Sequence, residues 1–155
     1  MATTRKQTAD SGCSSSADLA WFGVVAAFIP LWWDAARPYI EHALDRGHGE
    51  FLPDDIRTCL LSRAMQLWLL RRNDEIRGAL VTEIADYPRL RTVILRLFSA
   101  DRELRGQWEP LLAVIEDWAR DQGCAAIEIF GRPGWARRLD YELTHVVLRK
   151  ELKHE

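Results

Sequence analysis

The alternation of apolar and polar positions predicts a domain that mixes strands and helices. Apolar runs and two-residue alternation predict strands at residues 21–29, 65–70, 76–84, 91–98, 125–130 and 143–152. Apolar residues at helical spacing predict helices at residues 31–46, 54–61 and 108–122, and a shorter helix at residues 135–139.

The connections between these segments predict how the strands pair. Residues 72–75 read Arg-Asn-Asp-Glu, a turn sequence that joins the second and third strands as an antiparallel hairpin. Tyr87 and Pro88 separate the third strand from a fourth, which we expect to be antiparallel as well. The long helix then links the fourth strand to the fifth, and a helical crossover of this length makes the two strands parallel.

Length and composition indicate one domain with a polar tail. The chain has 155 residues, of which 48% are hydrophobic, enough to enclose one core. Residues 1–18 are rich in Ser, Thr and Ala without apolar periodicity, so we expect a disordered tail followed by a single domain at residues 19–155.

Charge, hydropathy and cysteine usage exclude several classes of function. The formal net charge of -2 offers no broad basic face, which argues against nucleic-acid binding. The apolar residues 20–33 contain Gly23 and Pro30 and are too few to span a membrane. Three widely spaced cysteines form neither a disulfide framework nor a zinc pattern, so we expect a cytoplasmic protein without a metal.

The order of the predicted elements over residues 21–152 resembles that of the GNAT N-acetyltransferases. The sequence LLAVIEDWARDQGC at residues 111–124 is similar to the long helix of that family and the turn after it. Residues 67–88 (LWLLRRNDEIRGALVTEIADYP) and 127–139 (IEIFGRPGWARRL) resemble, more narrowly, GNAT-like proteins of tailed bacteriophages. The resemblance implies a mixed α/β (α+β) sheet of six to seven strands, with an antiparallel N-terminal part and a splayed parallel pair around a central helix. It also implies transfer of acetyl from acetyl-CoA to an amine of a small molecule or protein, in the host cytoplasm if the protein is phage-encoded.

The resemblance also places the coenzyme. Its pantetheine would bind along the strand before the long helix, and its diphosphate at the start of that helix; the residues are Leu97, Phe98, Ser99, Arg102, Arg105, Gly106, Gln107 and Trp108. In the family's loop signature, Gly106 matches the first glycine, whereas Glu103 and Trp108 depart from it, and Pro110 lacks an N–H. Arg102 and Arg105 could supply charge-assisted hydrogen bonds instead, or could simply be solvated.

Three residues are candidates for the catalytic acid and base. Tyr141 matches the position of the family's frequent tyrosine acid, although an aromatic residue closing the edge of the sheet is the alternative. Glu83 and Glu128 are candidate bases because carboxylates are uncommon inside strands. Either could instead pair with an arginine, and Arg132 lies close to Glu128 in the sequence.

A second class of function stays open alongside the enzyme. The domain could be a coenzyme-free GNAT-like module that binds another protein or serves as a phage structural or accessory part. Seven tryptophans in a domain of this size suggest a wide apolar surface for a protein partner or an oligomer contact. In the segment GRPGW at residues 131–135, two glycines allow an abrupt turn that lets Trp135 fold over the end of the sheet.

Overall fold

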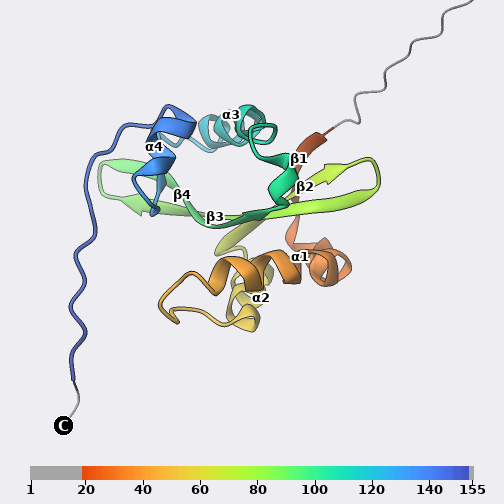
Figure 1. Cartoon of the computed structure of the whole chain (residues 1–155), viewed down its shortest axis with the longest axis horizontal. Helices are drawn as coiled ribbons and strands as arrows, with labels where there is room; N and C mark the ends of the chain where they lie inside the picture. The colour runs from red at the N-terminus through yellow and green to blue at the C-terminus, as the bar shows by residue number, and fades with distance from the viewer. Residues whose placement is uncertain (1–18, 154–155) are drawn as a thin grey trace, which may run out of the picture.

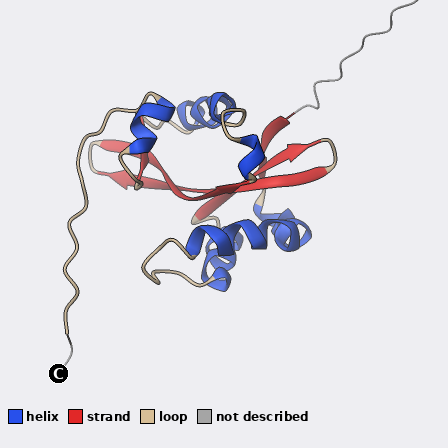
Figure 2. Cartoon of the chain, in the orientation of Figure 1, coloured by secondary structure: helices blue, strands red, loops and turns tan. Residues whose placement is uncertain are grey.

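The computed structural model of the chain describes residues 19–153, so the tail expected at residues 1–18 lies outside the described part. Up to α4, the strands and helices follow the predicted order (Figures 1 and 2). The strands are β1 (Leu19–Val24), β2 (Met65–Arg72), β3 (Glu75–Tyr87), β4 (Leu90–Ala100) and β5 (Ala126–Ile129). The α-helices are α1 (Ile29–Leu44), α2 (Pro53–Leu61), α3 (Ala113–Asp121) and α4 (Gly134–Leu139). Short 3-10 turns occupy Ala26–Phe28, Arg102–Leu104 and Glu109–Leu112.

The strands form one sheet in the order β1-β2-β3-β4-β5. The first three pairings are antiparallel, and β4 pairs with β5 in parallel, as the helical crossover predicted. Helices α1 and α2 cover one face of the sheet, and α3 and α4 lie on the other (Figure 1). None of the helices in residues 19–153 combines the length and the apolar character needed to cross a membrane.

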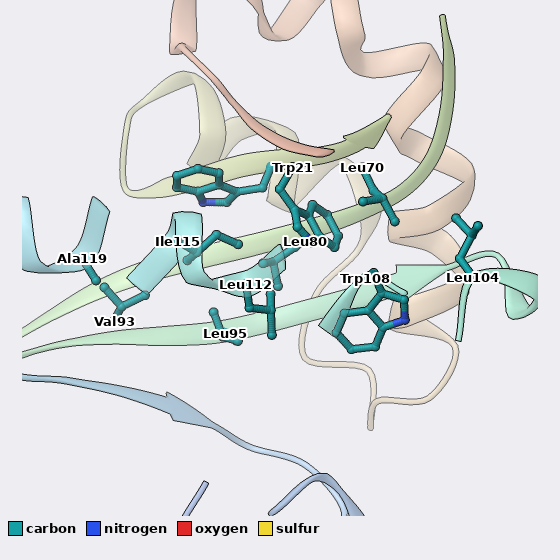
Figure 3. Packing of buried hydrophobic residues seen from close by; sticks show 11 residues of the cluster. Trp21, Leu70, Leu80, Val93, Leu95, Leu104, Trp108, Leu112, Ile115 and Ala119 are labelled. Atoms are coloured by element: carbon teal, nitrogen blue, oxygen red, sulfur yellow. The ribbon is translucent and has the colours of Figure 1, made fainter. Parts of the chain in front are cut away.

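Alternation along β2 distributes its side chains to both faces, as the sequence predicted. Met65, Leu67 and Leu69 pack under α1 and α2. Trp68 and Leu70 point to the opposite face, into a core that includes Leu112 and Ile115 of the α3 region (Figure 3). A central strand that is apolar on both sides is what a sheet covered by helices on both faces requires.

A β-bulge in β4 changes the face on which its later residues lie. Val81 of β3 pairs with Leu97 and Thr82 pairs with Leu95, which leaves Arg96 without a partner in β3. Strict alternation would put Phe98 on the face opposite Leu95, but the extra residue returns Phe98 to the α3 face, where it packs on that core. The bulge therefore brings an aromatic side chain to the part of β4 nearest the predicted coenzyme.

Two expectations about the sheet are wrong within the described residues. The sheet has five strands rather than six to seven, because residues 143–152, predicted as the last strand, belong to no strand or helix. An extended segment becomes a strand only when a neighbour accepts and donates its backbone hydrogen bonds. The first strand also ends earlier than predicted, at Val24, because residues 26–28 already turn toward α1.

A buried hydrogen-bond chain inside the sheet gives the first testable prediction. The Trp68 indole N–H donates to the Thr82 hydroxyl (3.1 Å), and that hydroxyl donates to the Gln66 amide oxygen (2.9 Å). Thr82 is fully buried, so Thr82→Val leaves the indole N–H without its acceptor and should lower the free energy of unfolding by about 1–3 kcal/mol.

Urea denaturation provides the measurement, with Thr58→Val as the matched control. Thr58 is exposed on α2, and its substitution should change the free energy of unfolding by less than about 0.5 kcal/mol. Equal effects of the two substitutions would show that the buried hydrogen bonds carry no special weight.

Candidate active site

The parallel strands β4 and β5 stop pairing halfway along β4. Their pairing runs from Thr92 and Ala126 to Leu95 and Ile129, where β5 ends, whereas β4 continues to Ala100. Beyond that point β4 is still paired with β3 on its other side. The side of β4 that faced β5 is therefore free of β5 along the three predicted pantetheine-binding residues, Leu97, Phe98 and Ser99.

Three aromatic side chains occupy the space where the strands part, and we call them the aromatic cluster: Phe98, Trp108 and Trp135. The ring centroids of Phe98 and Trp108 lie 4.2 Å apart, and Trp135 lies 5.6 Å from Phe98 and 5.7 Å from Trp108. The Arg138 guanidinium lies over both indoles and forms an ion pair with Glu109. Trp108 is 4% exposed and belongs to the core (Figure 3). The indole of Trp108 thus packs where the family's loop would place a small residue.

Within the aromatic cluster, Trp135 is less firmly held than Trp108. Trp135 lies on α4, a six-residue helix in which no residue is buried. Its indole seats against Gly131, where an added Cβ would lie 3.0 Å from the Trp135 Cδ1 atom, so this glycine makes room for the ring. A ligand that entered between β4 and β5 would displace Trp135 at lower cost than Trp108.

Three backbone amides in the loop before α3 donate within turns. The amides of Leu104, Arg105 and Gln107 donate to carbonyls three residues earlier at 3.0, 3.2 and 2.9 Å. The 3-10 turn Glu109–Leu112 precedes α3 and contains Pro110, so the α-helix begins only at Ala113 rather than near Trp108. These three amides cannot also bind a diphosphate, so the loop offers fewer free backbone donors than a regular helix N-terminus.

Arginine side chains in this loop can donate hydrogen bonds to an anion. Arg102 and Arg105 are exposed, and Gly106 has φ +82 with open space on the side where a Cβ would point. The buried Leu104 side chain and the Arg77–Asp101 salt bridge (2.7 Å) hold the loop against β3. A held loop with exposed guanidinium groups suits a diphosphate bound through charge-assisted hydrogen bonds.

Tyr141 lies just after α4 and faces α3. Its hydroxyl donates to the Glu116 carboxylate at 3.5 Å, and its amide donates to the Ala136 carbonyl at 3.0 Å. Burial, together with the negative charge of Glu116, raises the pKa of Tyr141 to about 12. The phenol consequently keeps its proton at neutral pH, as a general acid must.

The two candidate bases lie on either side of Ile94, one strand away in each direction. Ile94 pairs with Glu83 of β3 and with Glu128 of β5, which puts the two Cα atoms about 10 Å apart at the usual strand spacing. Glu83 forms a salt bridge with Arg96 at 2.5 Å, the arginine alternative that its sequence position left open. Glu128 forms no ion pair with Arg132 or with another described residue, so its carboxylate is the one available to accept a proton.

A cleft of about 1210 Å³ joins several of these residues at the β5 edge. Glu128, Tyr141, Glu116 and Trp135 all line it, and the loop between α1 and α2 closes one side. Glu83 is absent from its lining, and so are the diphosphate-loop residues 102–108. The structure therefore brings Tyr141 and Glu128 to one cleft and leaves Glu83 in a separate ion pair.

Sequence reasoning missed three residues of this region. Glu116, the partner of Tyr141, lies on the polar side of the long helix, and no sequence motif marks it as a partner. Arg138, which covers the aromatic cluster, is the second residue of an Arg-Arg pair that belongs to no sequence motif. Arg96, the partner of Glu83, became prominent only through the bulge. Among residues 19–153, no group of three or more His, Cys, Asp or Glu side chains is arranged to hold a metal ion.

Comparison with known proteins adds information at the level of the fold. No protein-family model matches the sequence, and no curated protein matches it. One similar solved structure is an aminoglycoside acetyltransferase from an uncultured soil metagenomic sample in complex with sisomicin, with TM-score 0.66 and 11% identity over 87% of this chain and 97% of the other. A second is an aminoglycoside N-acetyltransferase in complex with CoA, with TM-score 0.66 and 14% identity over 88% and 96%.

A third similar structure is a predicted acetyltransferase with acetyl-CoA from Clostridium acetobutylicum, with TM-score 0.62 and 12% identity over 86% of this chain and 96% of the other. Identities this low indicate a shared fold and do not establish a shared reaction. These matches span nearly the whole length of each neighbour and most of this chain. The chain therefore has the fold of the GNAT acetyltransferases.

Proposed function

We propose that the protein is an N-acetyltransferase that moves acetyl from acetyl-CoA to an amine of a small molecule or protein. The observation that carries the proposal is the free side of β4 at Leu97, Phe98 and Ser99, beyond the last pair with β5. An extended pantetheine has amides that can pair with a free strand edge as another strand would. Neighbours of the same fold were solved with CoA or acetyl-CoA, which supports the same donor here.

The proposed binding mode differs between the two ends of the coenzyme. The diphosphate would be held mainly by the side chains of Arg102 and Arg105, beside Gly106 and Gln107, because three of the loop amides are used in turns. The acetyl end would reach the cleft after Trp135 moves aside, with Phe98 and Trp108 forming the wall that remains. Binding that must displace an indole is weaker than binding to an open groove, so we expect modest affinity.

The proposed chemistry uses the two cleft residues. The acceptor amine nitrogen attacks the thioester carbonyl, and Glu128 takes the proton that the nitrogen releases. Tyr141 gives its proton to the departing thiolate sulfur, so the amide and the free thiol leave as neutral products. Glu83, paired with Arg96, would affect the electrostatic potential near β4 without contacting the reacting atoms.

Acetyl transfer to a panel of amines tests this function, because each turnover releases one free thiol. The panel should include an aminoglycoside and a peptide N-terminus, since similar structures include enzymes named for such acceptors. A product whose mass corresponds to the acceptor with one acetyl group in place of one amine hydrogen identifies the transfer. Hydrolysis of acetyl-CoA without any acetylated amine would refute the proposal.

Tyr141→Phe should lower turnover by about 10²–10⁴-fold and leave coenzyme affinity nearly unchanged, because only the proton donor is lost. Because the pKa of Tyr141 is raised from 10.0 to about 12, the phenol stays protonated as pH rises through 10. Deprotonation of Tyr141 should therefore reduce turnover only near pH 12. The stability that Tyr141 contributes through this shift is present below pH 10 and lost on approach to 12.

Tyr39→Phe is the matched control for Tyr141→Phe. Tyr39 is also partly buried with its pKa raised to about 12, but its hydroxyl lies 3.1 Å from the Asp101 carboxylate and from the Ile76 carbonyl, and Tyr39 does not line the cleft. Because Asp101 helps to hold the coenzyme loop, turnover is compared at saturating acetyl-CoA. A similar loss of stability in both variants, with turnover lost only in Tyr141→Phe, supports the acid role. Unchanged turnover in Tyr141→Phe would make Tyr141 a packing residue.

The second candidate is a coenzyme-free module that binds another protein. A domain without a donor pocket would also have a buried indole at Trp108 and loop amides that donate within turns. Failure of the protein to bind coenzyme, together with absence of acetyl transfer, would favour this module. The narrower association with tailed bacteriophages is supported by sequence resemblance alone.

A further inference from the structure

A second hollow adjoins the cleft at the Glu128 side chain. It has a volume of about 540 Å³, and we call it the side hollow. Its apolar lining comes from Tyr87, Pro88 and Leu90 around the turn between β3 and β4, and from Phe130 just after β5. Glu128 and Phe130 also line the main cleft, so the two spaces meet at these residues. A molecule held by the Glu128 carboxylate can therefore extend into the side hollow.

The apolar side chains of the side hollow are exposed to solvent. Tyr87, Leu90 and Phe130 are 53%, 43% and 51% exposed. Tyr87 pairs with Leu90 at the end of the β3–β4 hairpin, which extends beyond α1 and α2 (Figure 1). The pairing of β4 with β5 begins only at Thr92, so β5 does not pair with this end of the hairpin. A ligand that covers the three side chains would remove apolar surface from water, which favours its binding.

Glu128 is the acidic residue of the side hollow. Ile127 and Ile129 pack on the core beneath α3, so the alternating side chains of Glu128 and Phe130 face the other side of the sheet. The Glu128 carboxylate forms no ion pair with a described residue. A carboxylate between apolar side chains can bind an ammonium group and leave the remainder of the ligand to the apolar walls.

Three basic groups lie near this carboxylate. Arg96 lies over the Phe130 ring at 5.7 Å, but its guanidinium is already paired with Glu83. Arg89 and His145 complete the lining of the side hollow, and both are exposed. Water and salt screen exposed charges of this kind. The side hollow therefore keeps one carboxylate for a cation.

The charges around the main cleft are balanced. Four carboxylates, including those of Glu116 and Glu128, line it together with four guanidinium groups, including those of Arg46 and Arg132. An acceptor with several ammonium groups would meet as many like charges as opposite ones, so the cleft does not attract a polycation. An acceptor with one ammonium group needs only the carboxylate of Glu128.

We propose that the acceptor is a primary amine with a single positive charge and an aromatic body. Its ammonium group pairs with Glu128, and its body lies in the side hollow against Leu90 and the rings of Tyr87 and Phe130. Aromatic rings pack on one another in offset or edge-to-face arrangements, which favours an aromatic body over a polyhydroxylated one. This amine is the acceptor only if the proposed acetyl transfer is correct, whereas its binding does not depend on the transfer.

Calorimetric titration with 2-phenylethylamine, with and without acetyl-CoA, tests the site. Ethanolamine has the ammonium group without the apolar body, and 2-phenylethanol has the body without the charge. We expect 2-phenylethylamine to bind at least about 10-fold more tightly than either, because it uses both the carboxylate and the apolar walls. Sisomicin, which carries several ammonium groups, should bind more weakly than 2-phenylethylamine. Failure of 2-phenylethylamine to bind in both conditions, or equal or tighter binding of ethanolamine or sisomicin, would overturn the proposal.

Leu90→Ser should weaken the binding of 2-phenylethylamine by about 3–10-fold and leave ethanolamine unaffected, because only apolar contact is lost. Glu128→Gln should weaken the binding of 2-phenylethylamine and leave 2-phenylethanol unaffected, because the amide keeps the shape and loses the charge. Leu31→Ser is the matched control, since Leu31 is exposed on α1 and lines neither space. Equal weakening by Leu31→Ser and Leu90→Ser would contradict a contact in the side hollow.

Acetyl transfer to the same compounds separates this site from the proposed function. We expect 2-phenylethylamine to be acetylated with a higher kcat/KM than ethanolamine or sisomicin. Transfer that favours sisomicin would leave the acetyltransferase in place and overturn the aromatic acceptor. Binding of 2-phenylethylamine that depends on Leu90 and Glu128, without acetylation of any amine, would refute the proposed function and leave the amine site in place.

Discussion

Replacing Trp108 by alanine should lower the free energy of unfolding by about 3–5 kcal/mol, the largest stability effect expected in this region. The indole is 4% exposed and packs on Phe98 at 4.2 Å, so its removal leaves a cavity between the end of β4 and α3. Arg138 also loses one of the two rings over which its guanidinium lies. Denaturant unfolding followed by far-ultraviolet circular dichroism measures the change.

Trp135→Ala is the comparison that tells core packing from simple loss of a tryptophan. Trp135 belongs to the same aromatic cluster but lies on a helix without buried residues, so its removal should cost clearly less stability. The same variant should bind acetyl-CoA more tightly than the unmodified protein, because no indole has to be displaced. Equal losses of stability for the two variants, or weaker coenzyme binding by Trp135→Ala, would contradict the account of which ring gives way.

Arg105→Glu should weaken acetyl-CoA binding by about 10–100-fold or more, the largest functional effect expected outside the cleft. With the amides of Leu104, Arg105 and Gln107 donating within turns, the loop's attraction for a diphosphate depends mainly on its arginine side chains. A carboxylate at this position replaces attraction with repulsion. Equilibrium dialysis with labelled coenzyme provides the measurement.

Arg89→Glu makes the same change of charge at a harmless place. Arg89 is exposed in the turn before β4, whereas the loop with Arg105 follows the other end of that strand. Coenzyme affinity should be nearly unchanged in this variant. Similar weakening in both variants would mean that overall charge, and not a local contact, governs binding.

Much of the fold could be predicted from the chain because side-chain periodicity reflects burial directly. The alternation along β2 predicts that Leu67 and Trp68 lie on opposite faces of the sheet, and the structure confirms this. The parallel pairing of β4 and β5 followed from the length of the helix between them. Such features depend on neighbours in sequence, which a single chain makes visible.

Features that depend on cross-strand register could not be predicted. The bulge at Arg96 exists because Val81 and Thr82 skip a residue of β4, and no local pattern marks it. For the same reason, residues 143–152 look like a strand but have no pairing partner in the structure. Periodicity describes which face a residue prefers and says nothing about the partner that completes a strand.

The candidate site was less predictable than the fold because its residues meet only in space. Tyr141 and Glu128 were identified from their positions in the sequence, but the cleft that they share depends on the placement of α4 beside β5. The contact between Tyr141 and Glu116 joins residues 25 positions apart, which a helix-face pattern cannot show. Trp108 departed from the loop signature, and its structural reason, packing in the aromatic cluster, became clear only with the coordinates.

Calorimetric titration of the unmodified protein with acetyl-CoA tests the central claim most directly, that the donor binds where β4 and β5 part. The account predicts measurable heat at a stoichiometry of one coenzyme per chain, with weak affinity that increases in Trp135→Ala and decreases in Arg105→Glu. The absence of heat up to millimolar coenzyme, in the unmodified protein and in Trp135→Ala alike, would contradict the account and leave a fold without its donor site.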